Sequence, residues 1–413
     1  MKYGCIGEHL KHSFSKEIHN LLSDYEYEIR EIERDKLDAF MIERNFCAIN
    51  VTIPYKESVI PHMHYIDEHA ISIGAVNTVV NRGGLLYGYN TDFYGMTLLA
   101  EHAGVVLTGK KVVILGTGGT SKTAFAVATS QSAKEVLRVS RTAKEDAISY
   151  DDLYKFHTDA DVIINTTPSG MFPSIFDTPV DLDKFPNLSG ALDAVYNPLS
   201  TPFILNARKR GVPAEGGLYM LVAQAVRASE IFLDTKYPSD ATDKVYSKII
   251  KDKQNIVLIG MPASGKSTVG ALLSERLQKT LIDTDALIVE RAKMQIPEIF
   301  EKLGEKAFRD IESEVIKDCA ARNGSIIATG GGAVLRPENI EALRENGRIY
   351  FIDRPLGSLI PTDDRPLSST KEAIVKRYNE RYDIYRSAAD AIIDADCDAQ
   401  NVSEKIVGDF LKI

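Results

Sequence analysis

Two glycine-rich loops constrain this chain more than any other feature, because each lies between an apolar β-branched run and a segment with helical periodicity. The first loop, G-T-G-G at 116–119, follows the run Lys111–Leu115, and the second, G-M-P-A-S-G-K-S at 260–267, follows Asn255–Ile259. In such a context glycine lets the backbone turn sharply and present N–H groups to phosphate oxygens at a helix N-terminus. The sequence therefore predicts an α/β chain with mostly parallel sheets and two nucleotide sites, in two enzymes or in one with two mononucleotide folds.

The chain length and one polar stretch indicate how these two sites are divided. A chain of 413 residues is expected to form about two to four domains. Residues 234–254 are rich in Asp, Lys, Ser and Thr and contain Pro238, which is typical of a linker. We place a domain boundary near residue 250, which leaves a segment of ordinary domain size on either side.

The composition argues against several classes of partner. Asp and Glu total 58 against 49 Lys and Arg, for a net charge of -9, so the basic footprint of a nucleic-acid-binding protein is missing. No run of roughly 18 apolar residues predicts a membrane helix, and the N-terminal segment lacks the apolar core of a signal peptide. None of the four cysteines forms a C-x-x-C pair, which favours reduced thiols over zinc. We expect a cytoplasmic protein that binds neither nucleic acid nor membranes.

The strand after the first loop indicates which dinucleotide that loop binds. NAD-binding domains usually carry an acidic residue at the end of this strand, where it bonds the ribose 2′-hydroxyl. Here the strand ends in a serine, Arg141 and a threonine, and a guanidinium flanked by hydroxyls suits a 2′-phosphate. The pattern therefore predicts NADP. Its predicted contacts in these two segments are Gly116, Gly118, Gly119, Ser140, Arg141 and Thr142.

Six motifs follow one another along residues 1–235. They are H-S-F-S at 12–15, N-V-T-I-P-Y-K at 50–56, G-A-V-N-T at 74–78, N-T-D at 90–92, D-A-V-Y-N-P at 193–198 and G-G-L-Y-M-L-V-A-Q at 216–224. With the first glycine loop, this set is similar to shikimate dehydrogenase. The resemblance implies a substrate-binding lobe at 1–100, completed by helices at about 217–235, and a Rossmann-like NADP-binding lobe at 101–216. It also implies NADPH-dependent reduction of 3-dehydroshikimate to shikimate.

The same resemblance implies roles for individual residues. Lys56 and Asp92 would form the catalytic pair at the reacting C3 oxygen. This agrees with the chemistry, because hydride addition to a ketone produces an alkoxide that needs a proton and electrostatic stabilisation. The implied substrate ligands are Ser13, Ser15, Thr52, Lys56, Asn77, Asp92 and Gln224. Further implied NADP contacts are Thr166, Tyr196, Gly217 and Met220.

The second loop satisfies the full P-loop pattern G-x-x-x-x-G-K-S. In such a loop the backbone N–H groups surround phosphates, Lys266 reaches the β- and γ-phosphates, and Ser267 binds Mg²⁺. The predicted ATP contacts are Gly260, Ala263, Ser264, Gly265, Lys266, Ser267 and Thr268. The pattern identifies a nucleotide but leaves the second substrate open.

The rest of the C-terminal segment carries a second set of motifs. They are D-T-D at 283–285, I-P-E-I-F at 296–300, G-E at 304–305 with F-R at 308–309 and Glu312, T-G-G-G at 329–332, R-P-L at 365–367, and Arg381 with Tyr385. This set resembles shikimate kinase over residues 254–413, with 236–253 as the linker. The resemblance implies a P-loop NTPase-type domain, a three-layer α/β fold like that of nucleoside monophosphate kinases.

By this resemblance, shikimate is held by Asp285, Arg309, Gly331, Gly332 and Arg381. Two arginines suit a small carboxylated ring, because their planar guanidinium groups match a carboxylate. Asp285 and Lys266 would be catalytic together with Arg365, which is implied to be a lid residue that reaches the ATP phosphates. Asp283 would lie near Mg²⁺, through water.

The two resemblances imply adjacent steps of aromatic amino-acid biosynthesis, with 3-dehydroshikimate and shikimate as substrates and NADP(H), ATP and Mg²⁺ as cofactors. Two alternatives remain open at this point. One is a quinate/shikimate dehydrogenase whose kinase-like domain only binds nucleotide and regulates. The other is a non-enzymatic nucleotide-sensing module in which both sites are vestigial.

Overall fold

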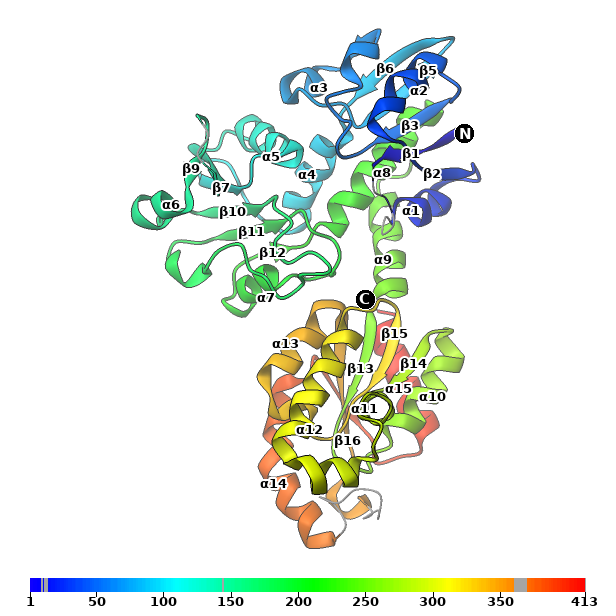
Figure 1. Ribbon diagram of the computed structural model, residues 1–413, viewed down its shortest axis with the longest axis vertical. Helices are drawn as coiled ribbons and strands as arrows, with labels where there is room; N and C mark the ends of the chain where they lie inside the picture. The colour runs from blue at the N-terminus through cyan, green and yellow to red at the C-terminus, as the bar shows by residue number, and fades with distance from the viewer. Residues whose placement is uncertain (9, 11–13, 143–144, 360–369, 413) are drawn as a thin grey trace. The chain divides into compact units, whose positions relative to one another are not determined.

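The computed structural model describes residues 1–8, 10, 14–142, 145–359 and 370–412. Two predicted site residues, Ser13 and Arg365, lie outside these described residues. The chain divides into two compact units, which we call unit 1 (Met1–Ile249) and unit 2 (Ile250–Ile413). In Figure 1, unit 1 is coloured from blue to green and contains the first glycine loop, and unit 2 continues from green to red and contains the second.

The first lobe of unit 1 is a six-stranded mixed sheet in the order β2-β1-β3-β5-β6-β4. Its elements are β1 (Tyr3–Gly7), α1 (Ser15–Leu22), β2 (Tyr27–Glu31), α2 (Leu37–Glu43), β3 (Ala48–Val51), β4 (Tyr65–Ile66), α3 (Glu68–Ile73), β5 (Thr78–Arg82) and β6 (Leu85–Tyr89). Strand β1 is parallel to β2 and β3, whereas β5 is antiparallel to β3 and β6. The β5–β6 hairpin turns through Gly83 and Gly84, whose φ values of 61° and 87° suit a two-residue turn.

The second lobe of unit 1 is a six-stranded parallel sheet in the order β12-β11-β10-β7-β8-β9. Its elements are β7 (Lys111–Leu115), α5 (Gly119–Ser130), β8 (Glu135–Ser140), β9 (Ile148–Ser149), α6 (Tyr150–Phe156), β10 (Val162–Asn165), β11 (Gly190–Asp193), α7 (Pro202–Lys209) and β12 (Ala214–Glu215). On β7, Val112 and Ile114 pack with α5 residues, whereas Val113 and Leu115 pack with α6 and α7. Helices therefore cover both faces of the sheet, and the Rossmann-like prediction is confirmed.

Two helices connect the lobes of unit 1, namely α4 (Thr91–His102) and α8 (Leu218–Leu233). They approach each other closely, because a Cβ atom on Gly95 would lie 2.7 Å from the carbonyl oxygen of Met220. Helix α8 contributes Phe232 to a core cluster on the first sheet and Met220 to one on the second. Helix α8 therefore belongs to the cores of both lobes, and α4, whose Met96 and Leu99 lie in the second cluster, packs against it.

The segment expected to be a linker, residues 236–253, contains helix α9 (Ala241–Lys253). Its buried residues include Ala241, Val245 and Ile249, which recur every four positions and so lie on one face of the helix. The Tyr219 hydroxyl donates a hydrogen bond of 2.7 Å to Asp243. The polar composition that suggested a linker comes from the solvent-facing residues of an amphipathic helix whose first part packs on unit 1.

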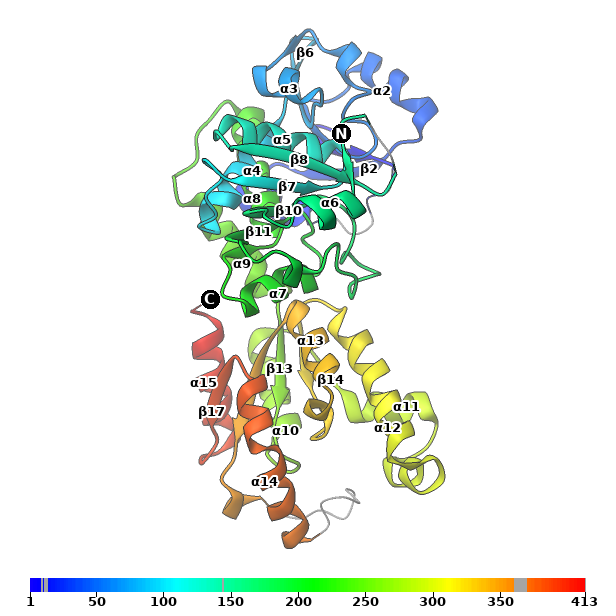
Figure 2. The ribbon, with the colours of Figure 1, turned by 90° about the vertical axis from the view of Figure 1, so that its left-hand side faces the viewer.

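Unit 2 is a five-stranded parallel sheet in the order β14-β15-β13-β16-β17. Its elements are β13 (Asn255–Ile259), α10 (Lys266–Leu277), β14 (Thr280–Asp283), α11 (Thr284–Ala292), α12 (Ile296–Ala320), β15 (Ser325–Ala328), α13 (Pro337–Asn346), β16 (Gly347–Asp353), α14 (Lys371–Ala388), β17 (Ala391–Asp394) and α15 (Ala399–Phe410). Alternate residues of β13 face opposite ways: Ile256 and Leu258 pack with α10 and α15, and Val257 and Ile259 pack with α12, α13 and α14. The sheet thus lies between two helical layers (Figure 2), and the three-layer α/β prediction is confirmed.

A buried carboxyl group lies near the C-terminal end of α13. Glu345 is only 2% exposed, and its Oε2 atom has no hydrogen-bond partner among the described residues. Burial raises the pKa of Glu345 to about 9, because the charged form is poorly solvated there. In the unfolded chain a glutamate titrates near pH 4.3. The folded state thus binds this proton more tightly, so the stability gained from it is complete below about pH 4 and is lost as the pH rises toward 9.

We predict that Glu345→Gln makes unit 2 less sensitive to pH. The neutral amide removes the cost of keeping a proton on Glu345, so the gain in stability over the wild type should grow between about pH 5 and about pH 8. Thermal unfolding at both pH values measures this difference. The matched control is Glu341→Gln on the exposed face of the same helix, which should follow the wild type. A variant that is destabilised equally at both pH values would contradict the assignment of a protonated Glu345.

Candidate active sites

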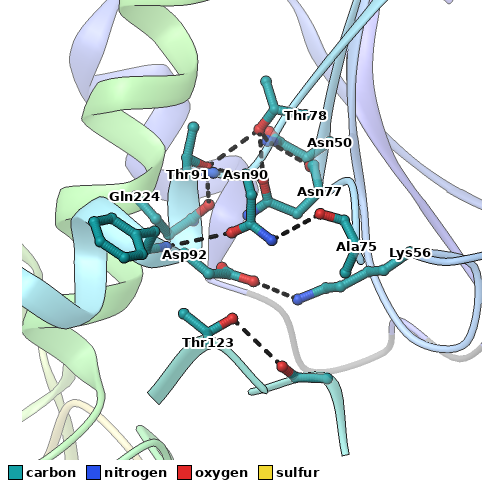
Figure 3. A network of polar contacts seen from close by, with 12 residues as sticks. Asn50, Lys56, Ala75, Asn77, Thr78, Asn90, Thr91, Asp92, Thr123 and Gln224 are labelled. Atoms are coloured by element: carbon teal, nitrogen blue, oxygen red, sulfur yellow. Dashed lines mark hydrogen bonds and ion pairs between the residues drawn. The ribbon is translucent and has the colours of Figure 1, made fainter. Parts of the chain in front are cut away.

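A largely buried ion pair in unit 1 joins the loop after β3 to the start of α4. The Nζ atom of Lys56 lies 2.6 Å from Oδ2 of Asp92, and their side chains are only 16% and 11% exposed. Figure 3 shows the two side chains pointing toward one another. Asn90 fixes the start of α4, because its Oδ1 accepts from the Phe93 N–H at 3.3 Å and its Nδ2 donates to the Ala75 carbonyl at 2.9 Å. Asp92 is therefore held in the first turn of α4, facing Lys56.

A network of uncharged polar groups lies beside this pair and joins residues of β3, β5, α4 and α8 (Figure 3). Asn77 Oδ1 accepts from the Thr91 backbone N–H at 2.8 Å and from the Thr78 hydroxyl at 3.0 Å. The Thr91 hydroxyl reaches Gln224 Oε1 on α8 at 3.3 Å. Asn50 Nδ2 donates to the Thr78 hydroxyl at 3.1 Å. The network thus brings together Asn77 and Gln224, two predicted substrate ligands that are far apart in sequence. Thr78, Thr91 and Asn50 hold this network in place.

The remaining predicted ligands of the first lobe have simpler surroundings. Thr52 follows β3, and its backbone N–H donates to the Ile6 carbonyl at 2.9 Å, which holds the partly exposed side chain at the end of the strand. Ser15 is the first residue of α1 and is also partly exposed. Ser13 lies outside the described residues.

The first glycine loop leads directly into α5. Gly116 has a φ of 108°, and a Cβ atom there would lie 2.8 Å from the Thr166 hydroxyl, so this position needs glycine. A Cβ atom on Gly118 or Gly119 would meet no atom within 4 Å. Gly118 also provides no side-chain cap for α5. The open side of the loop and the helix N-terminus together fit a dinucleotide phosphate.

The other predicted NADP contacts fall into two groups. Arg141 and Thr142 are exposed after β8, where Ser140 Oγ accepts from the Thr142 backbone N–H at 3.3 Å, and Arg141 forms no ion pair within the described part of the chain. Thr166 and Gly217 also make contacts within the fold itself. The Thr166 hydroxyl donates to the Leu115 carbonyl at 2.6 Å, and a Cβ atom on Gly217 would lie 2.3 Å from the Ala194 carbonyl oxygen.

Two further predicted NADP contacts lie in apolar surroundings. Met220 belongs to the core cluster that includes residues of β7 and α5. The ring of Tyr196 packs on Phe14 with a centroid distance of 5.3 Å, and burial raises the pKa of the Tyr196 hydroxyl. A neutral, half-buried tyrosine that packs on Phe14 of the other lobe suits contact with an uncharged ring rather than with a phosphate.

In unit 2 the P-loop adopts the strained backbone that phosphate loops require. Ala263 and Gly265 have φ values of 64° and 90°, and a Cβ atom on Gly260 would lie 2.9 Å from the Ile352 carbonyl oxygen. Lys266 Nζ donates to the carbonyl oxygens of Gly260 and Met261, both at 2.9 Å. The loop is thus folded around its own lysine, which lies at the start of α10.

A cleft of about 790 Å³ opens beside the P-loop. The predicted ATP and shikimate ligands among its lining residues are Ala263, Ser264, Gly265, Lys266, Ser267, Thr268, Asp285, Arg309, Gly331, Gly332 and Arg381. Arg309 Nη1 bonds Glu312 Oε2 at 2.7 Å, and Arg381 Nη1 donates to the Gly331 carbonyl at 3.1 Å. The structure therefore brings all but Gly260 and Arg365 of the predicted kinase ligands to one cleft, and Arg365 lies outside the described residues.

The three consecutive glycines after β15 are explained by close contacts. An added Cβ atom would lie 2.5 Å from Asp285 Oδ1 at Gly330, 2.9 Å from the Pro262 ring at Gly331, and 2.0 Å from Arg309 Nη1 at Gly332. Real Cβ atoms do not approach other atoms this closely. The glycines therefore let Asp285, the P-loop and Arg309 converge on a single strip of backbone.

A hydroxyl and a carboxylate at the cleft fit the predicted Mg²⁺ site. The Ser267 hydroxyl donates to Asp283 Oδ2 at 2.8 Å, while Asp283 Oδ1 caps α11 by accepting from the Asp285 N–H at 3.0 Å. Within the described residues, no group of three or more His, Cys, Asp and Glu side chains could hold a metal. Because Mg²⁺ in kinases keeps several waters and binds few protein oxygens together with substrate phosphates, the Ser267–Asp283 pair is compatible with the predicted site.

Several lining residues of the cleft were not predicted as ligands. Glu312 is 1% exposed, and burial raises its pKa although the neighbouring Arg309 opposes that shift. Phe300 and Arg377 also line the cleft. Glu312 and Phe300 stand in motifs that the sequence shows, whereas Arg377 belongs to none and its position is evident only from the fold.

Among the described residues, no helix has both the length and the apolar character needed to cross a membrane.

These two sites define a chain that joins a dinucleotide-binding oxidoreductase fold to a P-loop kinase fold. Family models agree: the shikimate dehydrogenase substrate binding domain matches residues 5–79, and shikimate kinase matches residues 262–411. A shikimate dehydrogenase (NADP(+)) of Clostridium beijerinckii is 35% identical over 260 residues, which are 59% of this chain and 96% of the relative. A shikimate kinase of the same organism is 46% identical over 158 residues, which are 37% of this chain and 93% of the relative.

A solved structure extends the comparison for unit 1. The shikimate 5-dehydrogenase of Thermus thermophilus, in complex with NADP(H) and shikimate, has a TM-score of 0.54 and 27% identity, and the match covers 60% of this chain and 99% of that one. The chain belongs to the shikimate dehydrogenase family through its N-terminal part and to the shikimate kinase family through its C-terminal part.

We predict that Gly332→Ala destabilises unit 2. The new Cβ atom must displace the Arg309 guanidinium, which leaves the buried Glu312 carboxylate without its counter-ion. Because the displaced guanidinium is the end of a flexible side chain, the cost comes from the unpaired buried carboxylate and is about 1–3 kcal/mol. Denaturant unfolding measures the loss, with Gly357→Ala as the control, because a Cβ atom at Gly357 meets no atom within 4 Å. Equal stability of the two variants would show that Arg309 does not occupy this position.

Proposed function

We propose that the chain catalyses two consecutive reactions. Unit 1 reduces 3-dehydroshikimate to shikimate with NADPH, and unit 2 phosphorylates shikimate to shikimate 3-phosphate with ATP and Mg²⁺. The observation that carries the proposal is that one chain holds both the Lys56–Asp92 pair and a P-loop cleft lined by Arg309 and Arg381. The product of the first reaction is the substrate of the second, so the two family memberships support each other.

In unit 1, NADPH supplies the hydride when it is bound. The ketone oxygen then gains negative charge and needs a proton, which the Lys56 ammonium donates. Asp92 accepts a hydrogen bond from that ammonium at 2.6 Å and so holds Nζ in position for the transfer. Because both side chains are largely buried, their interaction is screened less than it would be in water.

The uncharged network beside Lys56 orients the substrate ring. Asn77 Oδ1 is engaged by Thr78 and Thr91, and no described group bonds Asn77 Nδ2, which leaves this donor for a ring hydroxyl. Gln224 and Thr52 add further hydrogen-bonding groups, and Ser13 and Ser15 bind the carboxylate. For the cofactor, Gly118 and Gly119 accommodate the pyrophosphate, and Arg141 suits the 2′-phosphate of NADP.

In unit 2, ATP supplies the phosphoryl group when it is bound, and Mg²⁺ would neutralise part of the negative charge of the phosphates. The contribution of the chain is mostly positioning and charge neutralisation. Lys266 and the P-loop N–H groups would hold the nucleotide, Ser267 would bind the metal, and Asp283 would lie near it, through water. Arg309 and Arg381 hold the shikimate carboxylate, and Asp285 orients the 3-hydroxyl and accepts its proton. Asp285 lies against Gly330. Next to it are Arg309 and Arg381, which we call the arginine clamp.

The alternatives that the sequence left open lack support. A kinase-like domain that only regulates would not need an acceptor site. This cleft carries Asp285 and two arginines in addition to the P-loop. A vestigial sensor would not need the Lys56–Asp92 pair, which is intact and buried.

The test separates the two activities within one chain. Lys56→Ala should lower NADPH oxidation with 3-dehydroshikimate by about 10²- to 10⁴-fold, the usual contribution of a general acid, while phosphorylation of added shikimate stays within about twofold of the wild type. Lys266→Ala should do the reverse. Both rates are measured on each variant with saturating substrates.

Exposed lysines of the same units provide the controls. Lys36→Ala in unit 1 and Lys302→Ala in unit 2 remove charges that are paired at the surface, and each should leave both rates unchanged. Loss of both activities in either site variant would argue against independent sites. Full activity of Lys266→Ala with ATP would overturn the assignment of the P-loop.

A further inference from the structure

Arg377 is an arginine of the kinase cleft for which no role has yet been given. It lies on α14, four residues before Arg381, so the two guanidinium groups project from the same face of the helix. Arg377, Arg381 and Arg309 all line the cleft of about 790 Å³. Three arginines therefore face a space in which the proposed function requires two.

The charges around these arginines are not equally balanced. Arg309 is met by two carboxylates, Glu312 at 2.7 Å and Glu305 at 3.3 Å. Arg377 donates only to the Ala373 carbonyl of its own helix, at 3.4 Å, and forms no ion pair within the described part of the chain. Burial and the charge of Arg381 lower the pKa of Arg377, with a further lowering from Arg309 that Glu380 and Glu305 oppose. A partly buried guanidinium beside two others is costly unless an anion comes to it.

The neighbours of Arg377 indicate which of the two substrates would supply an anion to it. The charged groups with the largest effect on its pKa are Arg381, Glu380, Glu305 and Arg309, all from α12 and α14. Arg381, one helical turn away, donates to the Gly331 carbonyl, and Arg309 lies against Gly332, so both arginines border the triple glycine. The position is therefore on the acceptor side of the cleft, next to the arginine clamp.

We propose that Arg377 binds the carboxylate of shikimate together with Arg309 and Arg381 and so contributes to the choice of an anionic acceptor. This inference rests on the proposed kinase function and adds to it a residue that the motifs do not include. A third guanidinium provides N–H donors for carboxylate oxygens that the other two arginines leave free. In turn, the carboxylate of the bound acceptor balances the unpaired charge of Arg377.

The experiment compares Arg377→Ala and Arg377→Lys with the wild-type full-length chain. Shikimate binding is measured by calorimetry in the presence of Mg-ADP, and KM values are measured for shikimate and ATP. Arg377→Ala should raise the shikimate Kd and KM by about 10- to 100-fold, as expected for loss of a charge-assisted hydrogen bond, and should change the ATP KM by less than about twofold. Arg377→Lys should recover only part of the loss, because an ammonium lacks the planar pair of donors.

A neutral substrate analogue isolates the carboxylate. With shikimate methyl ester, the wild type and Arg377→Ala should differ by less than about threefold, because the negative charge that Arg377 recognises is gone. The matched control is Lys376→Ala, which removes the adjacent positive charge at an exposed position of the same helix. NADPH oxidation by unit 1 of each variant serves as the internal control for folding and concentration.

Each outcome bears on one claim. If the wild type neither binds nor phosphorylates shikimate, the proposed function falls and this inference falls with it. If the wild type does both and Arg377→Ala binds shikimate equally well, only the inference is overturned. A rise in the ATP KM alone would assign Arg377 to the nucleotide and would equally contradict the proposal. Full recovery by lysine would show a general field effect instead of direct contact.

Discussion

Both sites depend on the close approach of backbone segments where a buried parallel strand ends. Strands β7 and β13 are buried along their whole lengths and carry apolar side chains after their first residues, Lys111 and Asn255, so polar chemistry is left to the loops that follow. At those loops Gly116 lies against Thr166, and Gly260 lies against the Ile352 carbonyl, at distances that a Cβ atom would not tolerate. Glycine at these positions lets the loop turn and the next helix begin with free N–H groups facing a ligand.

Local charge also has to overcome the charge of the whole chain. The net charge of -9 works against anionic ligands at long range. In the kinase cleft, however, Lys266, Arg309, Arg377 and Arg381 lie with three carboxylates among the described lining residues, those of Asp283, Asp285 and Glu312. Carboxylates such as Glu312 then hold individual arginines in place without cancelling the positive character of the cleft. In unit 1 the Lys56–Asp92 pair is close to neutral overall, which suits the uncharged ketone group of the proposed substrate.

The sequence allowed the fold class, the P-loop and the first glycine loop to be predicted, because their signals are local: an apolar run, fixed glycine positions and a following helix. The pairing of Lys56 with Asp92 and the joining of Asn77 to Gln224 came from family resemblance, since these residues lie on separate elements. Their geometry could not be read from spacing. It depends on α4 and α8 packing closely at Gly95.

Two features could not be predicted from the sequence, for physical reasons. Helix α9 was expected as linker because its solvent-facing residues dominate its composition, although Ala241, Val245 and Ile249 repeat with helical spacing. Arg377 stands in no motif, and a lone arginine on a helix is more often a solvated charge. Only the packing of α14 next to the triple glycine shows that this side chain faces the cleft.

We propose that this one chain converts 3-dehydroshikimate to shikimate 3-phosphate. The most direct measurement supplies the wild-type protein with 3-dehydroshikimate, NADPH and Mg-ATP and follows NADPH oxidation together with the products by mass spectrometry. We expect shikimate to appear first and then to be replaced by shikimate 3-phosphate, with one ADP formed for each NADPH oxidised once the conversion is complete. Shikimate that accumulates while ATP remains unused would contradict the account.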